Sequence, residues 1–171
     1  MEQEHIAKAF KGLRNRLQTN PENGACTDSF ALATLSQRLR IEVTGPTGQV
    51  IQTDMAKGIG GGAAAPSPAW YMRAAASACT ATVIALRAAE LGIALDKLEV
   101  NFFSQSDSCG MLGVGTGIPA GPLNVSMQVQ ISAHGIDADE LKNLVSWGIE
   151  HSPVADAVQR AVPMEVAVTV N

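Results

Sequence analysis

Three cysteines, Cys26, Cys79 and Cys109, are the residues of this chain best suited to covalent chemistry. A cysteine is nucleophilic as its thiolate, so a reactive one needs a nearby cation or hydrogen-bond donor. The opening Met1–His5 is polar and acidic and leads into no apolar run, so we expect no signal peptide. An odd number of cysteines without a signal peptide argues against a disulfide framework. The other interpretation of each cysteine is a small buried hydrophobic residue.

Metal and dinucleotide sites are not predicted. The three histidines and three cysteines show no Cys-x-x-Cys or His-x-x-x-His spacing, so we expect no bound metal. The segment Gly58–Ala63 matches G-x-G-x-x-A, but Pro66 and Pro68 separate it from the next helix. An acidic residue for ribose binding is also missing about 20 residues further on. These glycines therefore indicate a flexible connector or a close approach of the backbone, and we expect no cofactor.

Cys79 lies in the middle of a long predicted helix. Trp70–Leu91 contains no Gly or Pro, Ser67 can cap its start, Pro68 suits its first turn, and Gly92 can end it. In mid-helix the thiol gains little from the helix dipole, which acts within the end turns. Because the helix carries only three charged residues, most of its circumference should be covered. A domain of this size can hardly cover it alone, which favours burial at a dimer interface.

The surrounding elements alternate between helices and strands. Residues 3–18 form an amphipathic helix with an apolar stripe of Ile6, Phe10, Leu13 and Leu17. The other expected elements are a strand over 35–43, a turn over 45–48, a strand over 50–53, strands over 97–102 and 123–133 around a glycine-rich loop at 107–122, a helix over 137–151, a short helix over 152–161 and a closing strand over 164–170. This order predicts an α+β domain with a mainly antiparallel sheet.

Composition limits the kinds of partner. The 171 residues have a net charge of −4, which argues against nucleic acid because phosphate binding needs a strongly positive surface. The charge-free stretch 74–86 is shorter than the roughly 20 apolar residues that span a bilayer, so we expect no membrane span and a cytoplasmic protein. We divide the chain into residues 1–24, the amino-terminal helix and connector, and residues 25–171, the main domain.

A series of short motifs in a fixed order resembles the OsmC/Ohr family, the osmotically induced and organic hydroperoxide resistance proteins. The motifs are Thr53-Asp54, Gly60-Gly61, Pro66-Ser67-Pro68, Ala74–Thr82 around Cys79, Leu91-Gly92-Ile93, Leu98-Glu99-Val100, Asp107 followed by Gly110, and His151-Ser152-Pro153-Val154. The resemblance covers about residues 28–170. It implies an OsmC-like fold of mainly antiparallel sheets around long central helices, in an intertwined homodimer with active sites between the subunits.

The resemblance also implies a reaction. The cysteine at the position of Cys79 attacks an organic hydroperoxide as a thiolate and becomes a sulfenic acid. An arginine from the amino-terminal part stabilises the thiolate, and Arg38 and Arg40 are the candidates, although both also suit solvated strand positions. A glutamate holds that arginine, a second cysteine closes a disulfide, and a dithiol of the lipoyl type regenerates the pair.

This sequence departs from the family pattern at two positions. Ser152, which can cap a helix but cannot form a disulfide, stands where the second cysteine is implied. Ala69 follows Pro68 where the glutamate is implied, and Glu42 is an alternative carboxylate. A sulfenic acid at Cys79 would then be resolved by an external thiol, or by Cys109 if their Cα atoms lie within about 7 Å.

Three hypotheses follow. The first is a one-cysteine thiol peroxidase that reduces organic hydroperoxides at Cys79 with an external thiol. The second is a non-catalytic homodimer that binds a small apolar ligand at the subunit interface, with Cys79 only packing. The third is an interaction protein that uses its amino-terminal helix. The retained Cys79 favours the first, and the missing glutamate and second cysteine favour the second.

Overall fold

Helix α2, Pro68–Leu91, is the longest element of the structure, a computed structural model that describes residues 2–170. The Trp70 N–H donates to Ser67 Oγ at 3.3 Å, and Pro68 occupies the first helical position. Gly92 follows the helix with a φ of +75°, the left-handed conformation that glycine adopts without steric cost. The predicted start and stop signals of this helix are therefore confirmed.

Helix α2 also has the length and composition of a membrane span, with a mean hydropathy of 1.3 over an 18-residue window. This result concerns length and composition only, so the expectation of no membrane span stays a prediction. The central helix of a soluble protein meets the same criterion. Five of its residues are buried: Ala76, Thr80, Ile84, Ala88 and Ala89.

The chain divides into two compact units, Met1–Lys8 with Ala76–Asn171, and Ala9–Ala75. The strands are β1 Leu32–Gln37, β2 Arg40–Thr44, β3 Val50–Thr53, β4 Lys97–Gln105 and β5 Asn124–Ser132. The remaining helices are α1 Glu2–Thr19, α3 Ser108–Leu112, α4 Ala138–Glu150 and α5 Pro153–Gln159, with 3₁₀ turns at Pro21–Gly24 and Lys57–Ile59. All strand pairs are antiparallel, so the α+β prediction is confirmed. The boundary after residue 24 stays a prediction.

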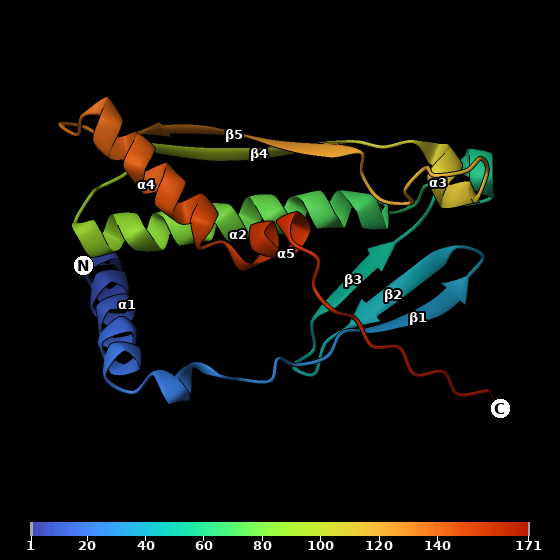
Figure 1. Cartoon of the computed structure of the whole chain (residues 1–171), viewed down its shortest axis with the longest axis horizontal. Coiled ribbons are helices and arrows are strands. Elements are labelled where there is room, and N and C mark those ends of the chain that lie inside the picture. Colours follow the sequence, from blue (N-terminus) through green and yellow to red (C-terminus); the bar gives the residue numbers. More distant parts are fainter. Residues whose placement is uncertain (1, 171) are drawn as a thin grey trace. The chain divides into compact units, whose positions relative to one another are not determined.

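The core of the first unit lies between α2, α4 and the β4–β5 pair (Figure 1). Ile84 and Ala88 of α2 belong to the same buried hydrophobic cluster as Leu144 of α4. The alternating apolar residues of β4 and β5 pack against it, while their polar neighbours face outward, as their period of two predicts. A Cβ at Gly148 would lie 2.3 Å from the Ile84 side chain, so glycine permits the close approach of α4 to α2.

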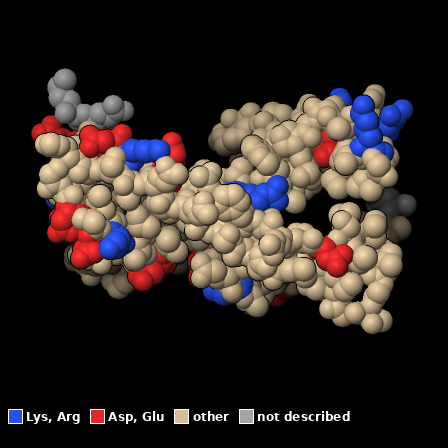
Figure 2. Space-filling model, turned by 90° about the horizontal axis from the view of Figure 1, so that it is seen from above, with Lys and Arg blue, Asp and Glu red and all other residues tan. Residues whose placement is uncertain are grey.

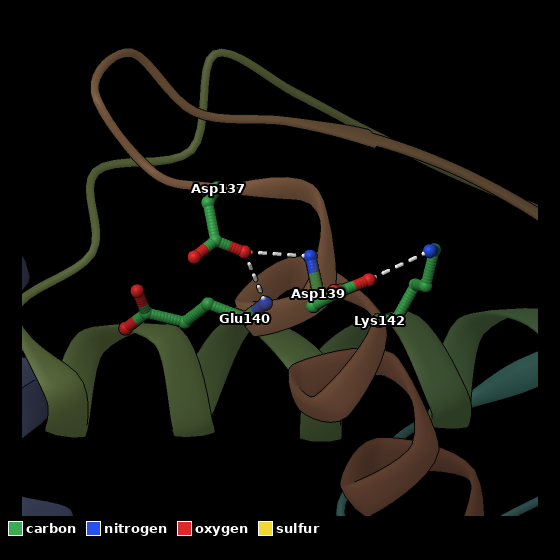
Figure 3. Close-up of polar contacts among 4 residues, drawn as sticks. All are labelled: Asp137, Asp139, Glu140 and Lys142. Carbon is green, nitrogen blue, oxygen red and sulfur yellow. Dashed lines mark hydrogen bonds and ion pairs between the residues drawn. The ribbon is translucent and has the colours of Figure 1, made fainter.

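Helix α4 begins at a carboxylate cap (Figure 3). Asp137 Oδ1 accepts hydrogen bonds from the N–H groups of Asp139 at 2.7 Å and Glu140 at 3.0 Å. Lys142 forms an ion pair with Asp139 at 2.8 Å on the exposed side of the helix. The predicted cap is confirmed, since it satisfies two of the amide groups that a helix start leaves unpaired.

The second unit contains the β1–β2–β3 sheet, and here one prediction is wrong. The strand expected over 35–43 is two strands, β1 and β2, joined by a two-residue turn at Arg38 and Leu39. Arg38 adopts a φ of +51°, a conformation usually given to Gly, Asn or Asp. Without one of those residues, the turn left no signal in the sequence. The second hairpin, through Gly45–Gly48, is as predicted.

Two further elements differ from expectation. The loop at 107–122 contains the short helix α3, whose first turn is capped by Asp107 through the Cys109 N–H at 2.8 Å. The closing strand at 164–170 is absent, and its alternating Met164, Val166, Val168 and Val170 are between 73% and 88% exposed. A strand needs a hydrogen-bonding neighbour, and this segment has none among the described residues.

Candidate functional site

Cys79 lies on α2 at the flank of its buried stripe. Ala76, Thr80 and Ile84 are fully buried at spacings of four, so they share one face of the helix. Cys79 is half-buried, one residue or about 100° from that face. It is eleven residues into the helix, so its predicted position in mid-helix, outside the end turns where the helix dipole acts, is confirmed.

Ser152 is placed beside the residue that follows Cys79. The Thr80 hydroxyl donates to Ser152 Oγ at 3.0 Å, and both residues are 0% exposed. The expectation that the Ser152 side chain caps α5 is therefore wrong: it makes no capping bond, and its oxygen accepts from Thr80 instead. A fully buried hydroxyl needs a partner, and this partner lies on α2 rather than on the helix that Ser152 begins. The motif His151-Ser152-Pro153-Val154 therefore lies next to the segment of α2 that contains Cys79.

Arg38 and Arg40 lie together in the second unit. With Gln37, Asp54 and Gly62 they line a small pocket of about 190 Å³. Arg38 is exposed in the turn, whereas Arg40 is half-buried at the start of β2. Both arginines remain candidates for stabilising the Cys79 thiolate. This role stays a prediction for each of them, because Cys79 belongs to the other unit.

Asp54 is the site residue that the sequence reasoning missed. Its carboxylate accepts hydrogen bonds from the N–H groups of Met55 at 2.8 Å, Ala64 at 3.0 Å and Gly62 at 3.1 Å, and the residue is 3% exposed. The Ala64 and Met55 bonds lower the pKa of Asp54 most, the Gly62 bond and the positive charge of Arg40 act in the same direction, and desolvation opposes them. The available signal was an aspartate four residues before the first glycine of a glycine-rich run.

The glycine-rich segment wraps around this carboxylate. A Cβ at Gly61 would lie 1.9 Å from the Met55 carbonyl oxygen, and one at Gly62 would lie 2.9 Å from Asp54 Oδ2. Of the two interpretations of Gly58–Ala63, close approach of the backbone is therefore the correct one.

The pocket lining includes none of the other candidate residues. Cys26 is exposed in the connector after the first 3₁₀ turn, and Cys109 is half-buried in α3. All three cysteines have free thiols, so resolution by Cys109 stays a prediction. Glu42 lies on β2 opposite Thr34 and Gln52. Within residues 2–170, no group of three or more His, Cys, Asp or Glu residues is placed to hold a metal ion.

Comparison with known proteins identifies the fold and the family. One similar solved structure is OsmC, an organic hydroperoxide resistance protein from Legionella pneumophila, with 19% identity and a TM-score of 0.58, covering 79% of this chain and 91% of that chain. An OsmC-like protein from Mycoplasma pneumoniae has 16% identity and a TM-score of 0.66, covering 79% of this chain and 89% of that chain. The organic hydroperoxide resistance protein OhrB of Bacillus subtilis has 18% identity and a TM-score of 0.53, covering 79% of this chain and 93% of that chain. At these identities they show a shared fold alone. No curated protein matches the sequence. The family model for OsmC-like proteins matches residues 60–167, well over half of the chain and including both Cys79 and Ser152. The chain therefore belongs to the OsmC-like family.

Proposed function

We propose that this protein reduces organic hydroperoxides through Cys79, as a one-cysteine peroxidase in oxidative-stress defence. The observation that carries the proposal is the hydrogen bond between Thr80 of α2 and Ser152. Thr80 is the residue after Cys79, and Ser152 stands where the family resemblance implies the second cysteine. That position therefore lies beside the Cys79 segment, but it holds a hydroxyl instead of a thiol. The Legionella and Bacillus proteins, described as organic hydroperoxide resistance proteins, support the substrate class.

The proposed reaction balances without a second protein thiol. The Cys79 thiolate attacks one peroxide oxygen, an S–O bond forms as the O–O bond breaks, and the departing alkoxide takes up a proton to leave as an alcohol. An external thiol then attacks the sulfenic acid, releases water and forms a mixed disulfide. A second external thiol displaces Cys79 and leaves as a disulfide with the first.

The thiolate needs a cation, and we assign this role to an arginine of the pair Arg38 and Arg40. A thiol beside a guanidinium ionises at lower pH, which raises the fraction of nucleophilic thiolate near pH 7. These two arginines line one pocket, and neither side chain forms a hydrogen bond or ion pair with the described residues.

We further propose that the working form is a cytoplasmic homodimer. Free cysteines are typical of a reducing compartment. The single chain leaves large apolar side chains uncovered, among them Leu32 at 56%, Leu35 at 63% and Val50 at 57% exposure in one sheet. Figure 2 shows charged side chains in small groups separated by broad areas without charge. Such areas are typical of surfaces that bind another protein.

A second candidate function, binding of a small apolar ligand without catalysis, is favoured by a groove in the first unit. It has a volume of about 720 Å³, and its lining combines apolar side chains with polar ones: Val129, Ile131, Ala138, Leu141 and Val145, and Lys97, Gln130, Lys142 and Ser146. This volume suits a small organic ligand. The groove contains neither Cys79 nor Ser152.

The deciding experiment is mass spectrometry of Cys79 after brief exposure to an organic hydroperoxide with a sulfenic-acid trap. Cys26→Ser and Cys109→Ser remove the other thiols, and Cys79→Ser is the negative control. We expect fast trapping at Cys79 that an added thiol reverses. Trapping no faster than at an ordinary exposed thiol would overturn the peroxidase proposal and favour ligand binding.

A further inference from the structure

The groove of about 720 Å³ in the first unit is lined chiefly by strand β5 and helix α4. Ala138, Leu141 and Val145, at spacings of three and four, form one stripe of α4 along the groove. Residues 129–131 of β5 form the opposite side. Every lining residue belongs to the first unit, so this groove is built within one compact part of the chain.

Strand β5 lies at the edge of its sheet. Successive side chains of a strand point to opposite faces, so a lining that includes residues 129–131 in a row follows the edge of the strand rather than one face. Within the described residues, β5 pairs with β4 alone. The other edge of β5 therefore presents backbone N–H and C=O groups without a strand partner, and the groove offers polar groups as well as apolar side chains.

Two lysines give the groove a positive charge. Lys97 of β4 and Lys142 of α4 both line it, and its lining within the described part of the chain includes neither Asp nor Glu. These are the two lysines that follow Lys57 in the sequence, in a chain with a net charge of −4. Although they come from different elements, folding brings both to one groove.

The ammonium groups of both lysines keep capacity for a ligand. Lys97 Nζ donates to Gln130 Oε1 at 2.8 Å and forms an ion pair with Glu99 at 3.1 Å, and Lys142 pairs with Asp139 at 2.8 Å (Figure 3). An ammonium carries three N–H donors, so these contacts leave N–H groups of each lysine for another acceptor. Both ion pairs are exposed, and exposed pairs contribute little free energy, so an anion in the groove can compete with them.

We propose that this groove binds a free organic anion with an apolar chain, such as a medium-chain carboxylate. The carboxylate pairs with Lys97 and Lys142, and the chain lies against apolar side chains such as Val129 and Val145. The volume is in the range of sites that enclose a small molecule, and the positive lining selects an anion over a neutral or cationic ligand of the same length. The inference rests on the second candidate function, ligand binding at this groove, and does not involve Cys79, which is not part of the lining.

The test is isothermal titration calorimetry with decanoate, decanol and decyltrimethylammonium, each below the concentration at which it forms micelles. The three probes share one chain length and differ in the charge of the head group. We expect decanoate to bind about tenfold or more tightly than decanol, because charge-assisted hydrogen bonds are stronger than neutral ones, and decyltrimethylammonium not to bind. Acetate should bind too weakly to detect. From hexanoate to decanoate, each added methylene should tighten binding by about twofold to fourfold.

Lysine variants locate the site. Lys97→Gln and Lys142→Gln should each weaken decanoate binding by about twofold to fivefold, and the double variant by about tenfold, without changing decanol binding. Both side chains are exposed, so the variants should keep the wild-type melting temperature in circular dichroism. Lys57→Gln, which makes the same change at an exposed lysine outside the lining, is the matched control. Equal weakening by Lys57→Gln, or an equal loss of decanol binding in the groove variants, would overturn the inference.

The outcomes separate this inference from the proposed functions. If decanol binds as tightly as decanoate, the groove is a ligand site but its selection of anions is wrong. If neither probe binds, the inference and the second candidate function fail together. None of the probes carries a peroxide group, so the reactivity of Cys79 is decided by its own experiment.

Discussion

At the scale of single residues, the hydroxyl pair of Thr80 and Ser152 connects the Cys79 helix to the start of α5. Each hydroxyl is fully buried, so each depends on the other for its hydrogen bond. The pair places residue 152 near position 79 even though this chain has no second thiol there. The Thr80 hydroxyl also gives the buried Ser152 side chain a hydrogen-bond partner, although that side chain does not cap α5.

Ser152→Cys tests this placement directly. A thiol at this position should form a disulfide with the Cys79 sulfenic acid, because residue 152 contacts the next residue of α2 and a disulfide requires Cα atoms within about 7 Å. Non-reducing peptide mapping after hydroperoxide treatment detects the cross-link. Serine-to-cysteine substitution at exposed Ser126 is the control, and a cross-link formed equally from both positions, or from neither, contradicts the placement.

Ser152→Ala should destabilise the protein by about 1–3 kcal/mol, because it leaves the buried Thr80 hydroxyl without a partner. Thr80→Val in the Ser152→Ala background should recover part of the loss, since both polar groups are then gone. Urea unfolding of the two single variants and the double variant measures this coupling. Strictly additive losses would show that the hydroxyls do not depend on each other.

Asp54 gives a stability that depends on pH. Its pKa is lowered in the folded protein, chiefly by the Ala64 and Met55 hydrogen bonds, so folding favours the ionised form. This contribution is fully present above about pH 5 and is lost as the pH falls through the lowered pKa. The difference in unfolding free energy between wild type and Asp54→Asn should therefore shrink between pH 6 and pH 3 (approximate limits). A difference that is constant across this range contradicts the role of the charge.

At the scale of elements, the backbone of the glycine-rich connector approaches itself closely at some glycines and not at others. Gly61 faces the Met55 carbonyl, whereas Gly58 has no atom within 4 Å of an added Cβ and no positive φ. The same residue type thus has a steric role at one position and none three residues earlier.

Gly61→Ala should lower the unfolding free energy by several kcal/mol or prevent folding, because its Cβ would lie 1.9 Å from a backbone oxygen. Gly58→Ala should be neutral or slightly stabilising, since it only restricts the unfolded chain. Thermal unfolding followed by circular dichroism compares the two variants. Equal melting temperatures would contradict the close approach.

At the scale of the whole molecule, α2 is covered on one side only. Ala78, Thr82 and Ala85 form an exposed stripe of small side chains at spacings of four and three. A single chain was expected to leave part of this helix uncovered, as it does here, and burial of the rest at a dimer interface stays a prediction. Small residues allow helix backbones to approach closely, so this stripe is where the proposed homodimer would bury α2.

The dimer prediction has a matched pair of substitutions. Ala85→Glu places a charge on the stripe and should shift the protein from dimer to monomer, because an unpaired charge buried in an interface is strongly unfavourable. Ala94→Glu makes the same change at an exposed position outside α2 and should leave the mass unchanged. Sedimentation equilibrium measures both. A wild-type monomer, or a dimer that tolerates Ala85→Glu, would contradict the prediction.

The sequence by itself determined the elements whose signals are local. The limits of α2, the Asp137 cap and the alternation of β4 and β5 depend on residues within a few positions of one another, so helix caps and periodicity were enough. Motif order likewise identified the family and singled out Cys79. Only the tertiary structure decided the split of the first strand, where Arg38 adopts a glycine-like conformation without a glycine signal. It also decided that Ser152 pairs with Thr80, 72 positions away, and that Asp54 is enclosed by the glycine-rich segment. Local patterns cannot encode such contacts, because they depend on which distant backbone passes each side chain after folding.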